Sequence, residues 1–325
     1  MKLGTLISGK KNGELIIVSK NLKSAIKVSD IAKNFSDAIE NWNEVSPILE
    51  KKYKFLNEGK EKDAFNINEK DLMACVPSAP LFADGSAFIQ HVKLVRMARK
   101  APLPETLETV PLMYQGESGR FLNPTENIKV ADFNYGTDFE GEVGVVTDFV
   151  PQGISAEEAL KHIKLILLIN DISLRGLIPA ELAQGFGFFQ SKPASALSPF
   201  CVTPEELGEA WVNGRVQLPL LVNYNRKFFG KANAKEMHFN FGQLISHAAK
   251  TRDLQAGTII GSGTVSNEDE SVGSSCLAEV RMIEQIKLGE MKTPFMKNGD
   301  EVSIEMLDIN GESIFGQINQ KVVIS

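Results

Sequence analysis

The chain opens with short apolar bursts that predict strands and then changes to a helical spacing. Residues 1–22 are interrupted by the turn pattern Gly9-Lys-Lys-Asn-Gly13, which predicts a strand, a turn and a second strand. Two sets of apolar residues then recur every three or four positions and predict two helices: Ile31, Phe35, Ile39 and Trp42, followed by Val45, Ile48, Leu49, Tyr53 and Leu56. We expect Ser29 and Asp30 to cap the first helix and Pro47 to lie in the first turn of the second.

A boundary near residue 72 separates this part from a longer region with a different pattern. Residues 58–71 are polar and dense in charge, so we expect an exposed connection there. Beyond them, apolar bursts broken by Pro, Gly, Asn and Asp predict six strands, at residues 140–147, 216–224, 258–261, 278–283, 301–307 and 313–318. Helices are expected after the capping box Ser155-Ala-Glu-Glu158 and over residues 241–251. The pattern predicts a β-rich α+β fold with a small N-terminal domain, residues 1–72, and a second domain, residues 73–325.

Composition and charge limit the kinds of molecule that the chain is expected to bind. The chain has 325 residues, of which 43% are hydrophobic and 23% are charged, and its net charge is −6 at pH 7. Because the basic residues are scattered among acidic ones, we expect neither nucleic acid nor a membrane as a partner. The densest apolar run, residues 165–169, is too short to span a bilayer, and the first ten residues carry no apolar signal segment, so a cytoplasmic protein is expected. The three cysteines, Cys75, Cys201 and Cys276, are far apart and predict free thiols.

Two carboxylates two residues apart are the first candidates for chemistry. In a strand, Glu140 and Glu142 project from the same face, roughly 7 Å apart along the chain. Two neighbouring anions repel each other unless a positive charge lies between them, and a hard cation such as Mg²⁺ or Ca²⁺ prefers carboxylate oxygens. The pair therefore indicates either a metal site or an edge strand with a solvated acidic face.

Four further residues are candidates, and each has a second interpretation. Asp171 follows the apolar run 163–170, where a buried strand should end, and is either a ligand or a helix cap. Asp84 is either a ligand or part of an Asp-Gly turn. His91 is either catalytic or structural, and Lys192, flanked by apolar and small residues, is either a partly buried cation or a surface lysine.

Taken in order, these segments resemble the fumarylacetoacetate hydrolase superfamily, and in particular its bacterial long-form members. The resemblance covers roughly residues 75–320 and rests on Asp84, Phe-Glu140-Gly-Glu142-Val, Asn170-Asp171-Ile-Ser-Leu-Arg175, Gln190-Ser-Lys192-Pro, Gly261-Ser-Gly-Thr264-Val-Ser-Asn267 and Glu279. It implies a small SH3-like N-terminal domain followed by a mixed β-sandwich roll.

The resemblance also implies roles for individual residues. The ligands of one divalent cation, Mg²⁺ or Ca²⁺ with Mn²⁺ as an alternative, would be Asp84, Glu140, Glu142 and Asp171. His91 would activate water, Glu279 would orient His91, and Lys192 would stabilise developing negative charge. The substrate would be contacted by Tyr114, Thr264 and a basic residue, Arg99 or its neighbour Lys100. The substrate contacts depart from those of the animal enzymes, because Ser86 and Ile178 stand where those enzymes have a tyrosine and a glutamine.

By resemblance, the chain would be a metal-dependent hydrolase that cleaves a C–C bond in a β-diketo acid, fumarylacetoacetate or an acylpyruvate. Water activated by His91 would attack the metal-chelated diketone. Decarboxylation, hydration or tautomerisation of a small 2-keto acid such as oxaloacetate on the same metal site is the alternative enzyme activity. A non-catalytic protein that binds keto acids is the alternative outside the enzymes. A homodimer is also implied.

Overall fold

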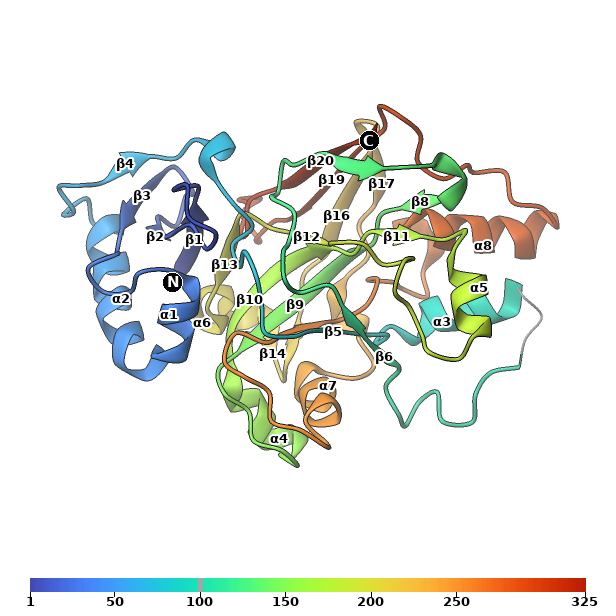
Figure 1. Cartoon of the computed structure of the whole chain (residues 1–325), viewed down its shortest axis with the longest axis horizontal. Helices are drawn as coiled ribbons and strands as arrows, with labels where there is room; N and C mark the ends of the chain where they lie inside the picture. The colour runs from blue at the N-terminus through green and yellow to red at the C-terminus, as the bar shows by residue number, and fades with distance from the viewer. Residues whose placement is uncertain (99–101) are drawn as a thin grey trace.

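The structure is a computed structural model that describes residues 1–98 and 102–325. It has a mixed, sheet-rich α+β fold, which confirms the expected class (Figure 1). Its central sheet has eleven strands and runs in the order β4-β3-β2-β1-β13-β10-β9-β18-β5-β6, with β12 paired to β10. The bounds are β1 (Lys2–Leu6), β2 (Glu14–Val18), β3 (Ser24–Lys27), β4 (Phe65–Asn66), β5 (Phe82–Gly85), β6 (Met113–Gly116), β9 (Gly141–Thr147), β10 (Ile163–Asn170), β12 (Ala196–Leu197), β13 (Phe200–Val202) and β18 (Ile259–Gly261). All neighbours are antiparallel except β18 and β5.

A second sheet of five strands has the order β17-β16-β19-β20-β7. Its strands are β7 (Ile128–Val130), β16 (Leu220–Tyr224), β17 (Lys227–Gly230), β19 (Glu301–Met306) and β20 (Ile318–Ile324). Two short ladders complete the strands: β8 (Thr137–Asp138) with β11 (Ser173–Leu174), and β14 (Trp211–Val212) with β15 (Arg215–Val216). The predicted strands at 140–147, 258–261 and 301–307 are confirmed, and the one at 216–224 is divided between β15 and β16.

Eight α-helices are present in the described ranges, and none of them is long and apolar enough to cross a membrane. They are α1 (Phe35–Glu40), α2 (Trp42–Asn57), α3 (Ile89–Ala98), α4 (Ala156–Ala159), α5 (Ile178–Ala183), α6 (Pro204–Leu207), α7 (Phe241–Ala248) and α8 (Leu277–Leu288). The two helices expected near Ser155 and over 241–251 are α4 and α7, which pack together, and α3 packs against α8.

In the N-terminal part, the strand-turn-strand is confirmed, but three details differ from expectation. The first helix begins at Phe35, because the Asn34 side chain accepts the Asp37 N–H at 3.0 Å and caps it there. Pro47 lies inside α2 instead of in its first turn. Residues 58–71 contain β4, which pairs with β3, so they are not only an exposed connection.

Two predicted strands are wrong in the C-terminal part. Residues 278–283 lie in α8, because Cys276 caps that helix and Gly289 ends it in the left-handed conformation. Residues 313–317 form a loop, and only Ile318 belongs to a strand, β20. Within the loop Phe315 is fully buried, and its carbonyl accepts the Phe200 N–H at 3.1 Å. Burial of an irregular segment produced an apolar pattern that resembles a strand.

The central sheet and one apolar core continue across the expected boundary near residue 72. β1 pairs with β13, and Leu3 lies opposite Cys201. Side chains of the N-terminal part such as Ile17 and Phe35 share a buried cluster with Leu165 and Ile259 of the other part. Figure 1 shows the N-terminal part, in blue, at one end of the molecule.

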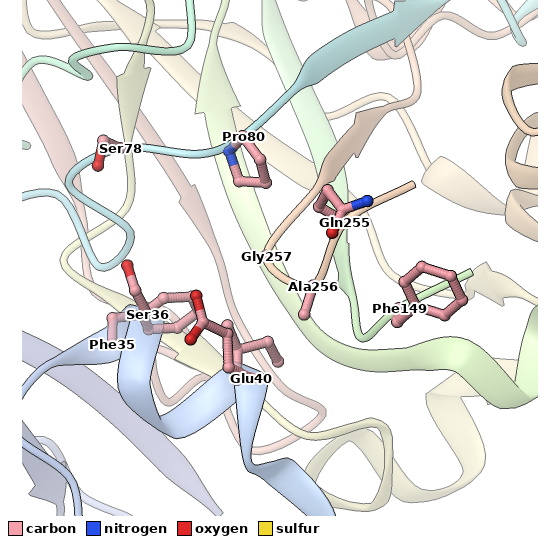
Figure 2. A pocket seen from close by; sticks show the side chains of 10 residues that line it. Phe35, Ser36, Glu40, Ser78, Pro80, Phe149, Gln255, Ala256 and Gly257 are labelled. Carbon is pink, nitrogen blue, oxygen red and sulfur yellow. The ribbon is translucent and has the colours of Figure 1, made fainter. Parts of the chain in front are cut away.

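A surface cavity of about 360 Å³ lies where α1 faces the turn before β18. Figure 2 shows Ser36 and Glu40 of α1 on one side and Gln255 and Phe149 on the other. The residues that line this cavity include none of the expected site residues. The candidate chemistry therefore lies elsewhere.

We predict that the two parts unfold as one unit. Residues 73–325 alone would expose the edge of β13 and the shared core, so this fragment should aggregate. Calorimetry of the full chain should give one transition with equal calorimetric and van't Hoff enthalpies. Two resolved transitions, or a soluble and natively folded fragment, would contradict this.

Candidate metal centre

Three carboxylates from neighbouring strands meet inside the protein. Asp84 lies in β5, Glu142 in β9, and Asp171 directly follows β10. One oxygen of each lies within 4.8 Å of those of the other two, and all three residues are buried. Gly261 of β18 makes room for this cluster, because a Cβ atom there would lie 2.3 Å from Asp84 Oδ1. We call Asp84, Glu142 and Asp171 the carboxylate trio.

The trio has the properties of an ion site. Neither oxygen of Glu142 has a hydrogen-bond partner among the described residues. Burial, together with the charge of Asp84, raises the pKa of Glu142 well above its usual value. Burial and the charge of Asp171 raise the pKa of Asp84 to about 8. Carboxylate oxygens at close range are the ligands that Mg²⁺, Ca²⁺ and Mn²⁺ take, and the two oxygens of Glu142 have no other partner within residues 1–98 and 102–325, so these residues fit a hard divalent cation.

Glu140, expected as a fourth ligand, lies outside the trio. Its Oε1 accepts hydrogen bonds from Lys192 Nζ at 2.8 Å and from the Ser173 hydroxyl, and its Oε2 accepts one from the Thr264 hydroxyl. Arg175 Nη2 lies 3.1 Å from Oε1. Burial alone would raise the pKa of Glu140, but Arg175 and Lys192 hold it well below its usual value. Its role as a ligand stays a prediction.

Lys192 is the buried cation of the cluster, which agrees with the interpretation as a partly buried residue. Its Nζ lies 2.5 Å from Asp171 Oδ2 and 2.8 Å from Glu140 Oε1. Burial would lower its pKa, but the charges of Asp171 and Glu140 raise the pKa of Lys192 instead. Asp171 also accepts hydrogen bonds from Ser195 Oγ at 2.5 Å and from the Tyr114 hydroxyl at 2.7 Å.

His91 and Glu279, 188 residues apart in sequence, touch as expected. His91 lies in α3 and Glu279 in the first turn of α8, and His91 Nδ1 is 3.0 Å from Glu279 Oε2. The His91 ring also contributes to lowering the pKa of Glu140, after the larger effects of burial, Arg175 and Lys192, so it lies within electrostatic reach of the cluster.

The expected substrate contacts are only partly brought together. Tyr114 and Thr264 adjoin the cluster, but their hydroxyls donate to Asp171 and Glu140. Arg99, like Lys100, lies outside the described residues. A cavity of about 560 Å³ is lined by Lys192 together with Phe188, whose ring packs edge-on against Tyr114 with centroids 5.2 Å apart.

Sequence reasoning missed two charged residues at the cluster. Arg175 Nε donates to Asp138 Oδ2 at 3.0 Å, and its Nη2 approaches Glu140. Asp138 is fully buried in β8, directly opposite Ser173 of β11. Asp138 lies two residues before Glu140, and Arg175 lies four residues after Asp171; this proximity to candidate ligands in the sequence was the available indication.

Two sequence families together match nearly the whole chain. The sequence family described as "Fumarylacetoacetate (FAA) hydrolase C-terminal" matches residues 80–323, and "Fumarylacetoacetase N-terminal domain 2" matches residues 1–78. A fumarylacetoacetase of Caenorhabditis elegans is 28% identical over 57% of this chain and 52% of its own length, so the match spans about half of that relative. An oxaloacetate tautomerase of Bacillus subtilis is 24% identical over 74% of this chain and 71% of its own length.

A solved structure shares the whole fold. The maleylpyruvate hydrolase of Sphingobium sp. SYK-6, in complex with manganese(II) and pyruvate, aligns over 100% of both chains with a TM-score of 0.64 and 15% identity. At that identity the likeness shows the fold alone.

We predict that Glu142→Gln removes metal-dependent stabilisation without destabilising the metal-free protein. The raised pKa already favours an uncharged side chain at this position, and glutamine has the same shape. In wild type, Mn²⁺ at 100 times its dissociation constant should add about 2.7 kcal/mol to the free energy of unfolding. Thermal melts with Mn²⁺ and with a chelator would measure this, with exposed Glu209→Gln as the control. Undiminished stabilisation in Glu142→Gln would remove Glu142 from the site.

The raised carboxyl pKa values also predict how stability depends on pH. A carboxyl group whose folded pKa exceeds its unfolded pKa stabilises the fold at low pH and loses this effect as pH rises through the folded pKa. For Asp84 the window runs from a pKa of 3.8 to about 8. In the presence of a chelator, the free energy of unfolding from urea melts should therefore fall between about pH 5 and pH 8, by about 1.4 kcal/mol per pH unit for each proton, and the urea midpoint should fall with it. Mn²⁺ should oppose the fall. A midpoint that rises with pH in chelator would be the contrary result.

Proposed function

This chain belongs to the fumarylacetoacetate hydrolase family, and from that premise we propose that it hydrolyses a C–C bond in a β-diketo acid such as an acylpyruvate or fumarylacetoacetate. In this proposal the carboxylate trio, with Glu140 as a fourth ligand, holds one divalent cation, Mg²⁺, Ca²⁺ or Mn²⁺. His91 and Glu279 form the proton-transfer pair.

The observation that carries the proposal is the contact between His91 and Glu279, within electrostatic reach of Glu140. Hydrolysis needs a base to activate water, and a histidine held by a carboxylate is suited to that task near neutral pH. Glu279 engages His91 Nδ1. Nε2 is then the nitrogen that takes a proton from water, and the carboxylate stabilises the imidazolium that results.

The bound cation would supply Lewis acidity and a template for two substrate oxygens. The remaining work falls to side chains of this chain. Lys192 has three N–H groups and uses two of them on Glu140 and Asp171, so the third can donate to an oxygen that gains negative charge. The loss of one such donor typically costs about 100- to 1,000-fold in kcat.

A second candidate is decarboxylation, hydration or tautomerisation of a small 2-keto acid such as oxaloacetate. The match to the oxaloacetate tautomerase favours it, since that match covers more of this chain than the fumarylacetoacetase match does. The same base can move a proton from carbon without attacking water. A protein that only binds keto acids has no use for the His91–Glu279 pair, which makes it the weakest candidate.

The proposal also includes a homodimer and a division of the chain into two parts. A homodimer follows from the resemblance. The division into residues 1–72 and 73–325 follows from the sequence pattern, and it describes two parts of one continuous sheet.

We predict that purified protein with Mn²⁺ or Mg²⁺ hydrolyses at least one acylpyruvate or fumarylacetoacetate and that both members of the His91–Glu279 pair are needed. His91→Ala and Glu279→Gln should each lower kcat at least about 100-fold, and the double variant should lose little more, because a base and its orienting group act as a unit. Steady-state kinetics over a panel that includes oxaloacetate would test this.

The matched control is a second histidine–carboxylate pair, at the ends of β9 and β10 that lie away from the trio. His162 Nδ1 lies 2.6 Å from Asp148 Oδ1, and His162→Ala should leave kcat unchanged. Turnover of oxaloacetate alone would replace the proposal with the second candidate. Metal binding without turnover of any diketo or keto acid would favour the binding protein.

A further inference from the structure

A buried aspartate that takes no part in the trio lies between the two halves of the candidate site. Asp138 of β8 is fully buried, and both of its oxygens are engaged. Oδ1 accepts the Leu277 N–H at 2.8 Å, and Oδ2 accepts the Ala278 N–H at 2.9 Å. Oδ2 also accepts a hydrogen bond from Arg175 Nε at 3.0 Å.

The two N–H groups that bind Asp138 belong to the first turn of α8. They have no partner within the helix, and a carboxylate placed there satisfies them and interacts favourably with the helix dipole. Two bonds to consecutive residues fix the direction in which the following side chain leaves the helix. That side chain is Glu279, whose carboxylate contacts His91 at 3.0 Å.

Asp138 is also connected to Glu140, through the side chain of Arg175. The planar guanidinium places Nε on Asp138 and Nη2 3.1 Å from Glu140 Oε1, so one rigid group spans both carboxylates. The β8–β11 ladder fixes the backbone of this pair, since the Arg175 N–H donates to the Gly136 carbonyl at 2.9 Å.

We infer that Asp138 and Arg175 are positioning residues that fix the position of the His91–Glu279 pair relative to Glu140 and the carboxylate trio. This inference rests on the proposed function. Asp138 would not touch the reacting atoms, because both of its oxygens are engaged by α8 and Arg175. Asp138 sets the position of Glu279 through the first turn of α8, and Arg175 links that turn to Glu140. The competing interpretation is that the two residues only balance buried charge.

The test is Asp138→Asn, which keeps the size of the side chain but loses its charge and one of its acceptor oxygens. A small displacement of a catalytic group can cost about 100-fold in rate, so we expect kcat to fall at least tenfold with KM changed less than about threefold. The Mn²⁺ affinity, measured by calorimetry, should stay within about threefold of wild type, because Asp138 does not contact the trio. The control is Asp132→Asn, which changes a half-buried aspartate that caps a turn by accepting the Asn134 N–H at 2.8 Å.

Two further measurements separate positioning from charge balance. Arg175→Lys keeps the charge but cannot span Asp138 and Glu140, so positioning predicts a similar loss of kcat and charge balance predicts none. Nitrogen-15 spectra of the histidine rings, with His91 assigned by His91→Gln, should show a weakened Nδ1 bond in Asp138→Asn.

The spectra do not depend on turnover, so they decide the inference even if no substrate is found and the proposed function fails. A wild-type His91 spectrum in folded Asp138→Asn would overturn the inference, as would wild-type kcat in both variants. If Asp138→Asn does not fold, Arg175→Lys decides by the same readouts.

Discussion

Buried negative charge is the constraint on which this structure depends. Five buried carboxylates, Asp84, Asp138, Glu140, Glu142 and Asp171, lie around two cations, Lys192 and Arg175, in the described part of the chain. Unpaired charges inside a protein are costly, and a buried group either gains a partner or gives up its charge. Here Lys192 and Arg175 form ion pairs with Glu140, Asp138 and Asp171. Glu142 and Asp84 are left either to be protonated or to bind an ion.

The fold concentrates these charges at one place because strands from distant parts of the sequence are neighbours. β10, β9, β18 and β5 lie side by side, and three of them bring a member of the trio to the same region. The short β8–β11 ladder places Asp138 and Arg175 beside it, and α3 packs on α8 so that His91 meets Glu279. The cation site and the base are thus held by different elements, and the Arg175 guanidinium connects them.

The sequence was a good guide to which residues gather and a poorer guide to how they pair. Asp171 was expected where a buried strand ends, and β10 does end at Asn170, because a run of apolar residues bounded by polar ones is a local property. The alternation of Glu140 and Glu142 suggested one shared ion. In the structure Lys192 and Arg175 pair with Glu140, and they reach it from segments that follow it by tens of residues, so no local pattern reveals these contacts. The helix α8 was mistaken for a strand for a similar reason, since one of the groups that fix its first turn is Asp138, far away in sequence.

The central claim is that the buried carboxylates form a site for one divalent cation. Anomalous diffraction from crystals of the protein grown with Mn²⁺ tests it most directly, because the metal is located without any assumption about the reaction. We expect one strong peak bonded to oxygens of Asp84, Glu142 and Asp171, at roughly 2.0–2.6 Å as for hard cations. The same map would show whether Glu140 leaves Lys192 to join the ion. A crystal with no peak between these three residues at saturating Mn²⁺, or with a peak held by other side chains, would contradict the account.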